Sequence, residues 1–115
     1  MKNKIANKNA SESVNNRDVF QGSNIFAELL RHHTCGCNEN LYVVYSYGHH
    51  FPMYVFDYDT REWYANKDKY SSTTSKHQTQ CRPRFEIARK FNTEDLKKLI
   101  ARGGMVGYVK WKAVA

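Results

Sequence analysis

Along the first 22 residues, hydrophobic positions are isolated and follow neither a helical nor a strand period. The larger apolar side chains, such as Ile5, Val14 and Phe20, are widely spaced among asparagines, serines and lysines. A segment that buries so little apolar surface cannot offset the conformational entropy that it loses on ordering. We therefore predict a flexible polar arm over residues 1–22, followed by a single domain over residues 23–115.

Two segments of that domain have the spacing of amphipathic helices. In residues 24–33, four apolar side chains fall on one helical face: Ile25, Phe26, Leu29 and Leu30. Residues 93–102 follow a potential cap at Asn92 or Thr93, begin with acidic residues and end at Gly103–Gly104. We predict one short helix at each position.

Runs of β-branched and aromatic residues predict the strands. Leu41–Tyr47, Phe51–Tyr58 and Glu62–Asn66 are separated by short turns, so we expect them to pair antiparallel. Phe85–Phe91 indicates a further extended segment, and Met105–Val114 alternates like a closing strand. The predicted fold class is α+β, with a mainly antiparallel sheet of about four or five strands and two short helices.

The segment between these elements, residues 67–84, is polar throughout and has almost no large apolar side chain after Tyr70. Two structures fit this pattern. One is a helix that begins near Ser72 or Thr73 and ends before Pro83, and the other is a long ordered loop. A polar stretch of this length between core elements is more often functional than connective.

The chain of 115 residues has no apolar run near the roughly 20 residues that span a bilayer. Its lysine- and asparagine-rich start lacks the apolar stretch of a secretory signal. We therefore expect a soluble cytoplasmic protein with no membrane partner. Its three cysteines are too few for a disulfide scaffold, and in a reducing compartment we expect them to be free thiols.

Positive charge is concentrated in one part of the chain. The whole chain carries a formal net charge of +7. From Lys67 to Lys90, seven basic residues stand against two acidic ones, which gives a local net charge of +5. Cations neutralise phosphates, and the aromatic residues in and beside this stretch can stack on unpaired bases. The stretch is therefore predicted to bind nucleic acid, either RNA or DNA.

The predicted nucleic-acid-binding residues combine basic, hydroxyl, amide and aromatic side chains. They are Lys67, Lys69, Tyr70, Thr73, Thr74, Ser75, Lys76, His77, Gln78, Arg82 and Arg84. If Thr73–Ser75 begin a helix, their backbone N–H groups add an anion site. A simpler interpretation is a solvated basic face whose hydroxyl and amide groups only cap a helix or satisfy the backbone.

Histidines and cysteines raise a zinc hypothesis, and the residues concerned are His32, His33, Cys35, Cys37, His77 and Cys81. A Cys-x-Cys pair beside two histidines is not a usual zinc-ligand spacing, so we expect neither a metal nor another cofactor. A metal-free phosphodiesterase is a further alternative. It would use His49, His50 and His77 with Tyr70, Lys76, Arg82 and Arg84. No spacing requires these groups to converge, so we assign no catalytic residue.

Part of the sequence within residues 42–83, a little over a third of the chain, resembles small phage- and plasmid-encoded domains of unknown function. The resemblance rests on Tyr47–Pro52, Trp63–Tyr64 with Asn66, Lys69–Ser71, Thr73–Gln78 with Gln80, and Arg82–Pro83. It implies a mobile-element origin and work in the host cytoplasm, and it carries over no chemistry. An alternative function follows from it, an interaction protein that binds and inhibits a host factor such as a defence complex. The oligomeric state stays open.

Overall fold

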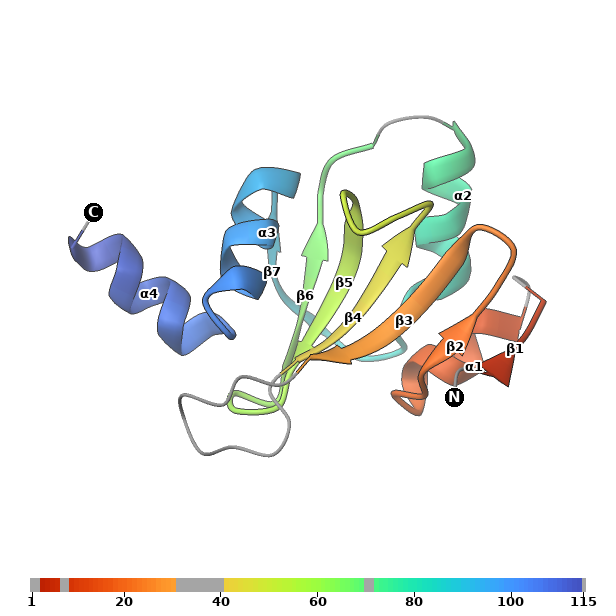
Figure 1. Cartoon of the computed structure of the whole chain (residues 1–115), viewed down its shortest axis with the longest axis horizontal. Coiled ribbons are helices and arrows are strands. Elements are labelled where there is room, and N and C mark those ends of the chain that lie inside the picture. The colour runs from red at the N-terminus through yellow and green to blue at the C-terminus, as the bar shows by residue number, and fades with distance from the viewer. Residues whose placement is uncertain (1–2, 7–8, 31–40, 70–71, 115) are drawn as a thin grey trace.

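The computed structural model describes residues 3–6, 9–30, 41–69 and 72–114. This part of the chain contains seven strands and four helices (Figure 1). In chain order they are β1 (Asn3–Lys4), α1 (Ala10–Asn15), β2 (Phe20–Gln21), β3 (Ile25–Leu30), β4 (Leu41–Ser46), β5 (Pro52–Asp57), β6 (Glu62–Asn66), α2 (Ser72–Cys81), β7 (Ile87–Phe91), α3 (Thr93–Ala101) and α4 (Met105–Val114). The α+β class is as predicted.

The strands form one sheet whose spatial order follows the chain from β1 to β7. Neighbours from β2 to β6 pair antiparallel, which agrees with the short turns in the sequence. The outermost pairs, β1–β2 and β6–β7, are parallel. Parallel neighbours need a crossover connection, and α1 and α2 lie in these two crossovers. The sheet is therefore mixed and has more strands than the sequence predicts.

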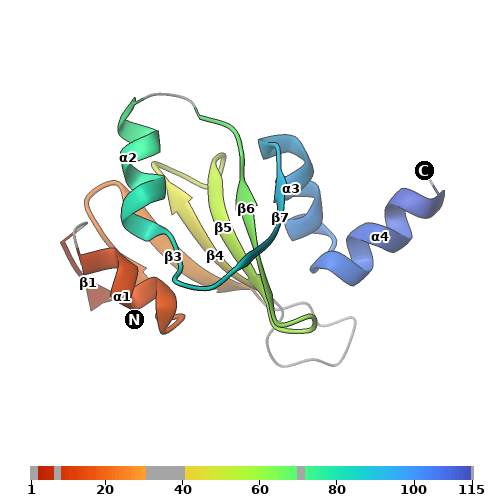
Figure 2. The same ribbon diagram turned by 180° about the vertical axis from the view of Figure 1, so that it is seen from behind.

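Helices cover both faces of the sheet (Figure 1, Figure 2). Ala10 and Val14 of α1, with Cys81 of α2, are buried in the core of one face. Leu96 and Leu99 of α3 are buried in the core of the other face, together with Tyr108 of α4. We call these the α1/α2 face and the α3/α4 face. Because both faces are covered, the central strands β4 and β5 are buried along their whole length.

The segment predicted as a flexible arm is part of the fold. Residues 3–4 add a strand to the sheet edge, and residues 10–15 form α1. Ala10, Val14 and Phe20 are fully buried. The sequence pattern misses this because the segment buries only a few isolated side chains, each of which fills space beside α2 or the sheet. The segment is polar where it faces solvent, and its buried side chains attach it to the core.

Residues 25–30 form strand β3 instead of the helix predicted over residues 24–33, whose last three residues lie outside the described part of the chain. Ile25, Ala27 and Leu29 pack on the α1/α2 face, and Phe26 and Leu30 pack on the α3/α4 face. A strand covered on both faces is apolar on both sides. Its adjacent apolar pairs therefore imitate a helical stripe, and pairing with β4 decides the structure.

Residues 105–114 form helix α4 instead of the predicted closing strand. The Oδ2 of Asp57 accepts a hydrogen bond of 2.7 Å from the Met105 N–H at the first turn of this helix. Gly104, with φ +125°, precedes it, and a β-carbon there would lie 2.7 Å from the same Asp57 oxygen. A distant carboxylate and a glycine thus begin α4, and neither appears in the local alternation of residues 105–114.

The other predicted elements are present. Strands β4, β5 and β6 lie where the sequence places them, and the Asn92 side chain caps α3 by accepting from the Asp95 N–H at 2.8 Å. Of the two structures considered for residues 67–84, the helix is found, as α2. Within the part of the chain that the structure describes, no helix combines the length and the apolar character required to cross a membrane.

Candidate nucleic-acid interface

A pocket of about 310 Å³ opens on the α1/α2 face, between α2, the end of β6 and strand β7. Four basic side chains line it: Lys67, Lys69, Arg82 and Lys90. No acidic residue is among the described residues of its lining. We call this site the basic pocket. A surface that concentrates one sign of charge around a concave site attracts ligands of the opposite sign.

The β6–α2–β7 crossover brings these cations together. Ala65 of β6 pairs with Lys90 of β7, and the Lys67 N–H continues the ladder by donating to the Phe91 carbonyl at 2.8 Å. Lys67 and Lys69 therefore leave the sheet beside the strand that carries Lys90. Arg82 follows the last turn of α2. Cations 15 to 23 positions apart in the sequence, counting from Lys67 to Arg82 and to Lys90, thus surround one pocket.

Polar contacts fix α2 on the sheet beside the pocket. The Tyr54 hydroxyl donates to the Gln78 carbonyl oxygen at 2.6 Å. The Gln78 Nε2 donates to the carbonyl oxygens of Asn66, at 3.3 Å, and Asp68, at 3.0 Å. Burial raises the pKa of Tyr54 to about 12, so its hydroxyl stays a donor at neutral pH. These bonds hold the Lys67–Lys69 segment against α2 although the helix has little apolar surface.

Gln78 also presents an acceptor. Its side chain is 8% exposed and lines the basic pocket. Because its Nε2 donates to two carbonyl oxygens, the orientation of the amide is determined. Its Oε1 is buried and has no hydrogen-bond partner among the described residues. Native structures contain few buried polar atoms without a partner, and one next to a pocket can mark a site where a ligand donates.

Asp68 lies in the same segment but is engaged elsewhere. Its Oδ2 accepts at 2.7 Å from the N–H of Thr93, the first residue of α3. Hydrogen bonds from Thr93 hold the pKa of this carboxyl below its usual range. Asp68 therefore stays charged and serves the first turn of α3. It does not line the pocket, although the charge of Lys67 also contributes to lowering its pKa.

His77 belongs to the core instead of the pocket. Its side chain is 3% exposed, its Nδ1 lies 2.8 Å from the Ser46 Oγ, and its ring lies 5.3 Å from that of Tyr47. Burial, and secondarily the charge of Lys76, lowers the pKa of His77. The imidazole is therefore neutral at physiological pH. It fastens α2 to the end of β4.

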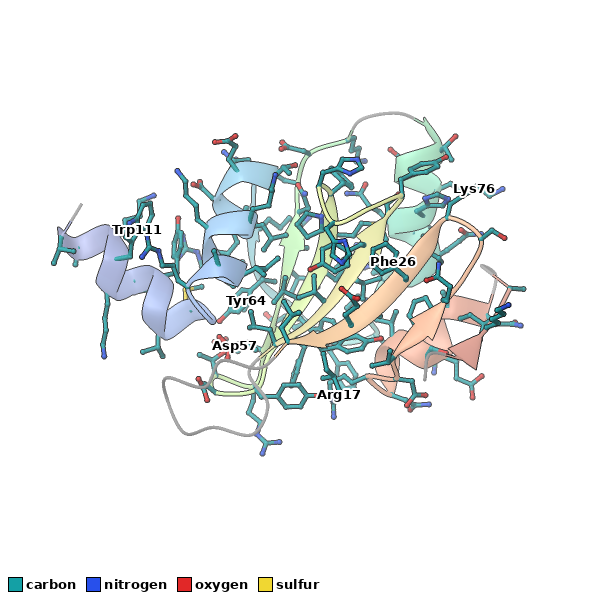
Figure 3. All side chains as sticks on the ribbon, viewed as in Figure 1. Arg17, Phe26, Asp57, Tyr64, Lys76 and Trp111 are labelled. Atoms are coloured by element: carbon teal, nitrogen blue, oxygen red, sulfur yellow. The ribbon has the colours of Figure 1, made fainter. Side chains whose placement is uncertain are left out.

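Three further predicted binding residues, Thr73, Lys76 and Arg84, are not part of the described lining of the pocket. Lys76 points outward from α2 (Figure 3), and Thr73 is also exposed. The Arg84 side chain is exposed, while its backbone N–H donates to the Asn15 Oδ1 at 2.6 Å. Tyr70 and the side chain of Thr74 lie outside the described part of the chain. Of the predicted set, the pocket gathers Lys67, Lys69, Ser75, Gln78 and Arg82.

The zinc hypothesis gains no support where it can be examined. His32, His33, Cys35 and Cys37 lie in residues 31–40, outside the described part of the chain. Among residues 3–6, 9–30, 41–69 and 72–114, no three His, Cys, Asp or Glu side chains form a group that could hold a metal ion. Burial raises the pKa of the Cys81 thiol to about 12.

Two of the three histidines considered for phosphodiester chemistry, His49 and His77, lie on opposite faces of the sheet. His77 bonds to Ser46, whereas His49 makes an edge-to-face contact with Tyr45, with ring centroids 4.8 Å apart. Tyr45 and Ser46 are consecutive in β4, so their side chains point to opposite faces. The His49 Nε2 is further engaged by the Glu28 Oε1 at 2.6 Å. These two imidazoles cannot act on one phosphate as acid and base.

Sequence reasoning misses some residues of the pocket. Lys90 contributes to the local charge in the sequence, but no sequence pattern assigns it to the site. Tyr54 appears in the sequence only as a strand residue, and Asn66 only as a strand residue that belongs to the resemblance, yet both form part of the lining and anchor the pocket. Thr79 also lines the pocket, one turn after Ser75 on α2. A parallel pairing of β6 with β7 would have indicated Lys90, but no local signal specifies that pairing.

Comparison of the chain with protein-family models, with curated proteins and with solved structures found no match.

Proposed function

We propose that this protein binds single-stranded nucleic acid through the basic pocket, as a small accessory protein of a phage or plasmid in the cytoplasm of the host. The observation that carries the proposal is the convergence of Lys67, Lys69, Arg82 and Lys90 around one pocket without an acidic residue in its described lining. Several cations around one concavity suit a ligand with repeated phosphates, because each cation neutralises one phosphate and releases its counterions.

Neutral polar groups of the pocket complement this charge. Ser75 lines the pocket with a hydroxyl group, and hydroxyls bond to phosphate and sugar oxygens. The Thr79 hydroxyl also lies in the lining, but it donates to the Ser75 carbonyl oxygen at 3.1 Å. Gln78 supplies an acceptor that a sugar hydroxyl or a base amino group can use. One exposed aromatic ring lies on the same chain segment, that of Phe85, which is 53% exposed. Stacking on this ring requires an unpaired base, which favours a single strand over a duplex.

The test is fluorescence anisotropy of labelled single-stranded RNA, single-stranded DNA and duplex DNA at several salt concentrations. Two variants with the same loss of charge are compared with the parent. One replaces the pocket cations Lys67, Lys69, Arg82 and Lys90 by alanine. The matched control replaces four exposed cations outside the pocket by alanine, namely Lys76, Arg84, Lys97 and Lys110.

The proposal expects the parent to prefer a single strand at near-physiological salt. We expect the pocket variant to lose most of this affinity. Its slope of log K against log salt concentration should be shallower by about 3, because each of the four lost phosphate contacts contributes roughly 0.7. The control variant should keep most of its affinity. If both variants lose affinity equally, the charge acts generically and the pocket has no special part. If the parent binds only at low salt and equally to all three nucleic acids, the proposal fails.

A second candidate function is binding of a partner protein, such as a host factor, through α4. Val106, Val109 and Val114 of this helix are 50%, 52% and 85% exposed, and Lys110 and Lys112 flank them. Apolar side chains with a basic rim fit an apolar groove with acidic edges. In a nuclease-treated pull-down, a protein recovered by the parent but lost by a Val106→Ser, Val109→Ser variant would support this function. Equal recovery by both would count against it.

A further inference from the structure

A second pocket, of about 580 Å³, lies beside the segment that connects α2 to β7. Three aromatic side chains line it, Phe56 of β5, Trp63 of β6 and Phe85, and we call it the aromatic pocket. Trp63 is 2% exposed and its ring contacts that of Phe56, whereas Phe85 is half exposed and therefore accessible to a ligand. Aromatic walls of this kind bind flat, unsaturated rings by stacking.

The polar groups of this pocket differ from those of the basic pocket. Arg17 and Arg61 line it together with Glu62 and Glu86, so its charges balance. It therefore offers both donors and acceptors around its aromatic walls. This combination suits a neutral planar ring with donor and acceptor groups on its edges, and nucleobases have this chemistry. A phosphate, which only accepts when ionised, is better served by the basic pocket.

Trp63 adds an unused donor. Its indole Nε1 is buried and has no hydrogen-bond partner among the described residues. The indole N–H can only donate, so it can be satisfied only by an acceptor. Buried Trp side chains usually find a partner for this group. An acceptor atom on a ligand ring in the aromatic pocket would supply one.

The backbone at the two arginines is also unusual. Arg17 has φ 55° and Arg61 has φ 60°, and Tyr47 is the other non-glycine residue with positive φ in the described part of the chain. The left-handed conformation is uncommon for such residues, and strained positions concentrate at binding sites. Arg17 lies at the same end of the sheet as Asp57, from which the β5–β6 turn leads to Arg61 (Figure 3). The guanidinium of Arg17 stacks over the Phe56 ring at 4.6 Å.

The two pockets are adjacent. Ile87 lines the basic pocket, while its chain neighbours Glu86 and Ala88 line the aromatic pocket. We infer that the aromatic pocket takes one unpaired nucleobase of the strand whose phosphates lie in the basic pocket. This inference rests on the proposed function for the strand as a whole. The base would stack on Phe85 and accept a hydrogen bond from the Trp63 indole.

The first test uses nucleosides, because they carry no phosphate and do not depend on the basic pocket. The indole N–H signals of Trp63 and Trp111 are followed by NMR during titration with adenosine, guanosine, cytidine and uridine. A Trp63→Phe variant identifies the Trp63 signal, and a Phe85→Ala variant keeps the indole but removes the exposed wall. At least one nucleoside should shift the Trp63 signal saturably in the parent, and much less in Phe85→Ala. The Trp111 signal should stay unchanged.

The second test separates the base from the backbone. The parent, Phe85→Ala and Val106→Ala, a control at another exposed apolar site, bind a labelled single strand and an equally long abasic strand. Phe85→Ala should weaken binding of the base-bearing strand about tenfold without changing its salt slope, and should not weaken binding of the abasic strand. No nucleoside shift at the Trp63 indole up to the solubility limit would overturn the inference. Absence of any strand binding by the parent, with the nucleoside shift present, would instead remove the proposed function alone.

Discussion

The Asp57 carboxylate joins two distant parts of the chain by bonding to Met105. Its Oδ2 accepts from the Met105 N–H at 2.7 Å, at the start of α4, while its Oδ1 accepts from the backbone N–H groups of Asp59 and Thr60 in the turn after β5. Asp57 is fully buried. One side chain thus accepts hydrogen bonds from backbone N–H groups of the tight turn and of the first turn of α4, and so links the sheet to α4.

Replacing Asp57 by alanine should therefore lower the free energy of unfolding by about 2–3 kcal/mol, because the partly buried N–H groups of Met105 and of the turn lose their acceptor. Urea unfolding followed by tryptophan fluorescence measures this change. Glu12→Ala removes an exposed carboxylate from α1 and should change the free energy by less than about 0.5 kcal/mol. A change of that small size in Asp57→Ala would show that the carboxylate does not hold α4.

The same contact explains which elements could be predicted from the sequence. Strands β4, β5 and β6 and helix α3 follow from their own residues, since alternation, short turns and the Asn92 cap are local signals. β3 and α4 depend on partners elsewhere in the chain. β3 is read correctly only when both of its faces are known to be covered, and α4 needs Asp57, which lies 48 positions before Met105.

Among the cations of residues 67–90, those that line the basic pocket should contribute more to binding than those that point away from it. Arg82 lines the basic pocket, whereas Lys76 points outward from the helix. We expect Arg82→Ala to weaken single-strand binding about tenfold, or about 1.4 kcal/mol, because it removes a charged partner of the ligand. Lys76→Ala, with the same charge change, should have less than about a threefold effect. Anisotropy titration at fixed salt compares them, and equal losses would contradict the assignment of Arg82 to the site.

The candidate site was predictable in its charge but not in its shape. The local net charge indicates Lys67, Lys69 and Arg82, but equally Lys76 and Arg84, because a count of charges does not show which way each side chain points. Direction comes from the β6–α2–β7 crossover and from the bond of Tyr54 to the Gln78 carbonyl, which fix one side of α2 toward the pocket. His77, one residue before Gln78, consequently faces the core beside Ser46.

Buried His77 should make stability depend on pH. Its pKa in the folded state is lower than the ordinary value of 6.5, mainly because of burial. As pH falls below about 6.5, the unfolded chain binds a proton that the folded protein does not. The contribution of neutral His77 is thus complete above that pH and is lost as pH falls toward the lowered pKa. Ser46, Tyr47 and Lys76 are its neighbours, and none supplies a compensating negative charge.

The measurement is urea unfolding at about pH 7.5 and about pH 5.5 for the parent, His77→Gln and His49→Gln. The parent should lose stability at the lower pH, and His77→Gln should lose less because glutamine does not titrate. His49→Gln is the control, since His49 is exposed and bonds to Glu28 on the other face. If the parent and His77→Gln show the same pH dependence, the titrating group lies elsewhere.

Cys81 should be inert toward alkylation in the folded protein. The reactive form of a thiol is the thiolate, and burial raises the pKa of Cys81 to about 12 while its side chain is fully buried in the core of the α1/α2 face. We expect iodoacetamide to label the peptide containing Cys81 at least about a hundredfold more slowly in buffer than in denaturing urea, as read by mass spectrometry. Ala10→Gly, which removes a buried methyl group from the neighbouring helix α1, should speed labelling by loosening this packing. Fast labelling of Cys81 in the native parent would mean that α2 separates from the sheet. Because residues of α2 line the basic pocket, the pocket would open at the same time.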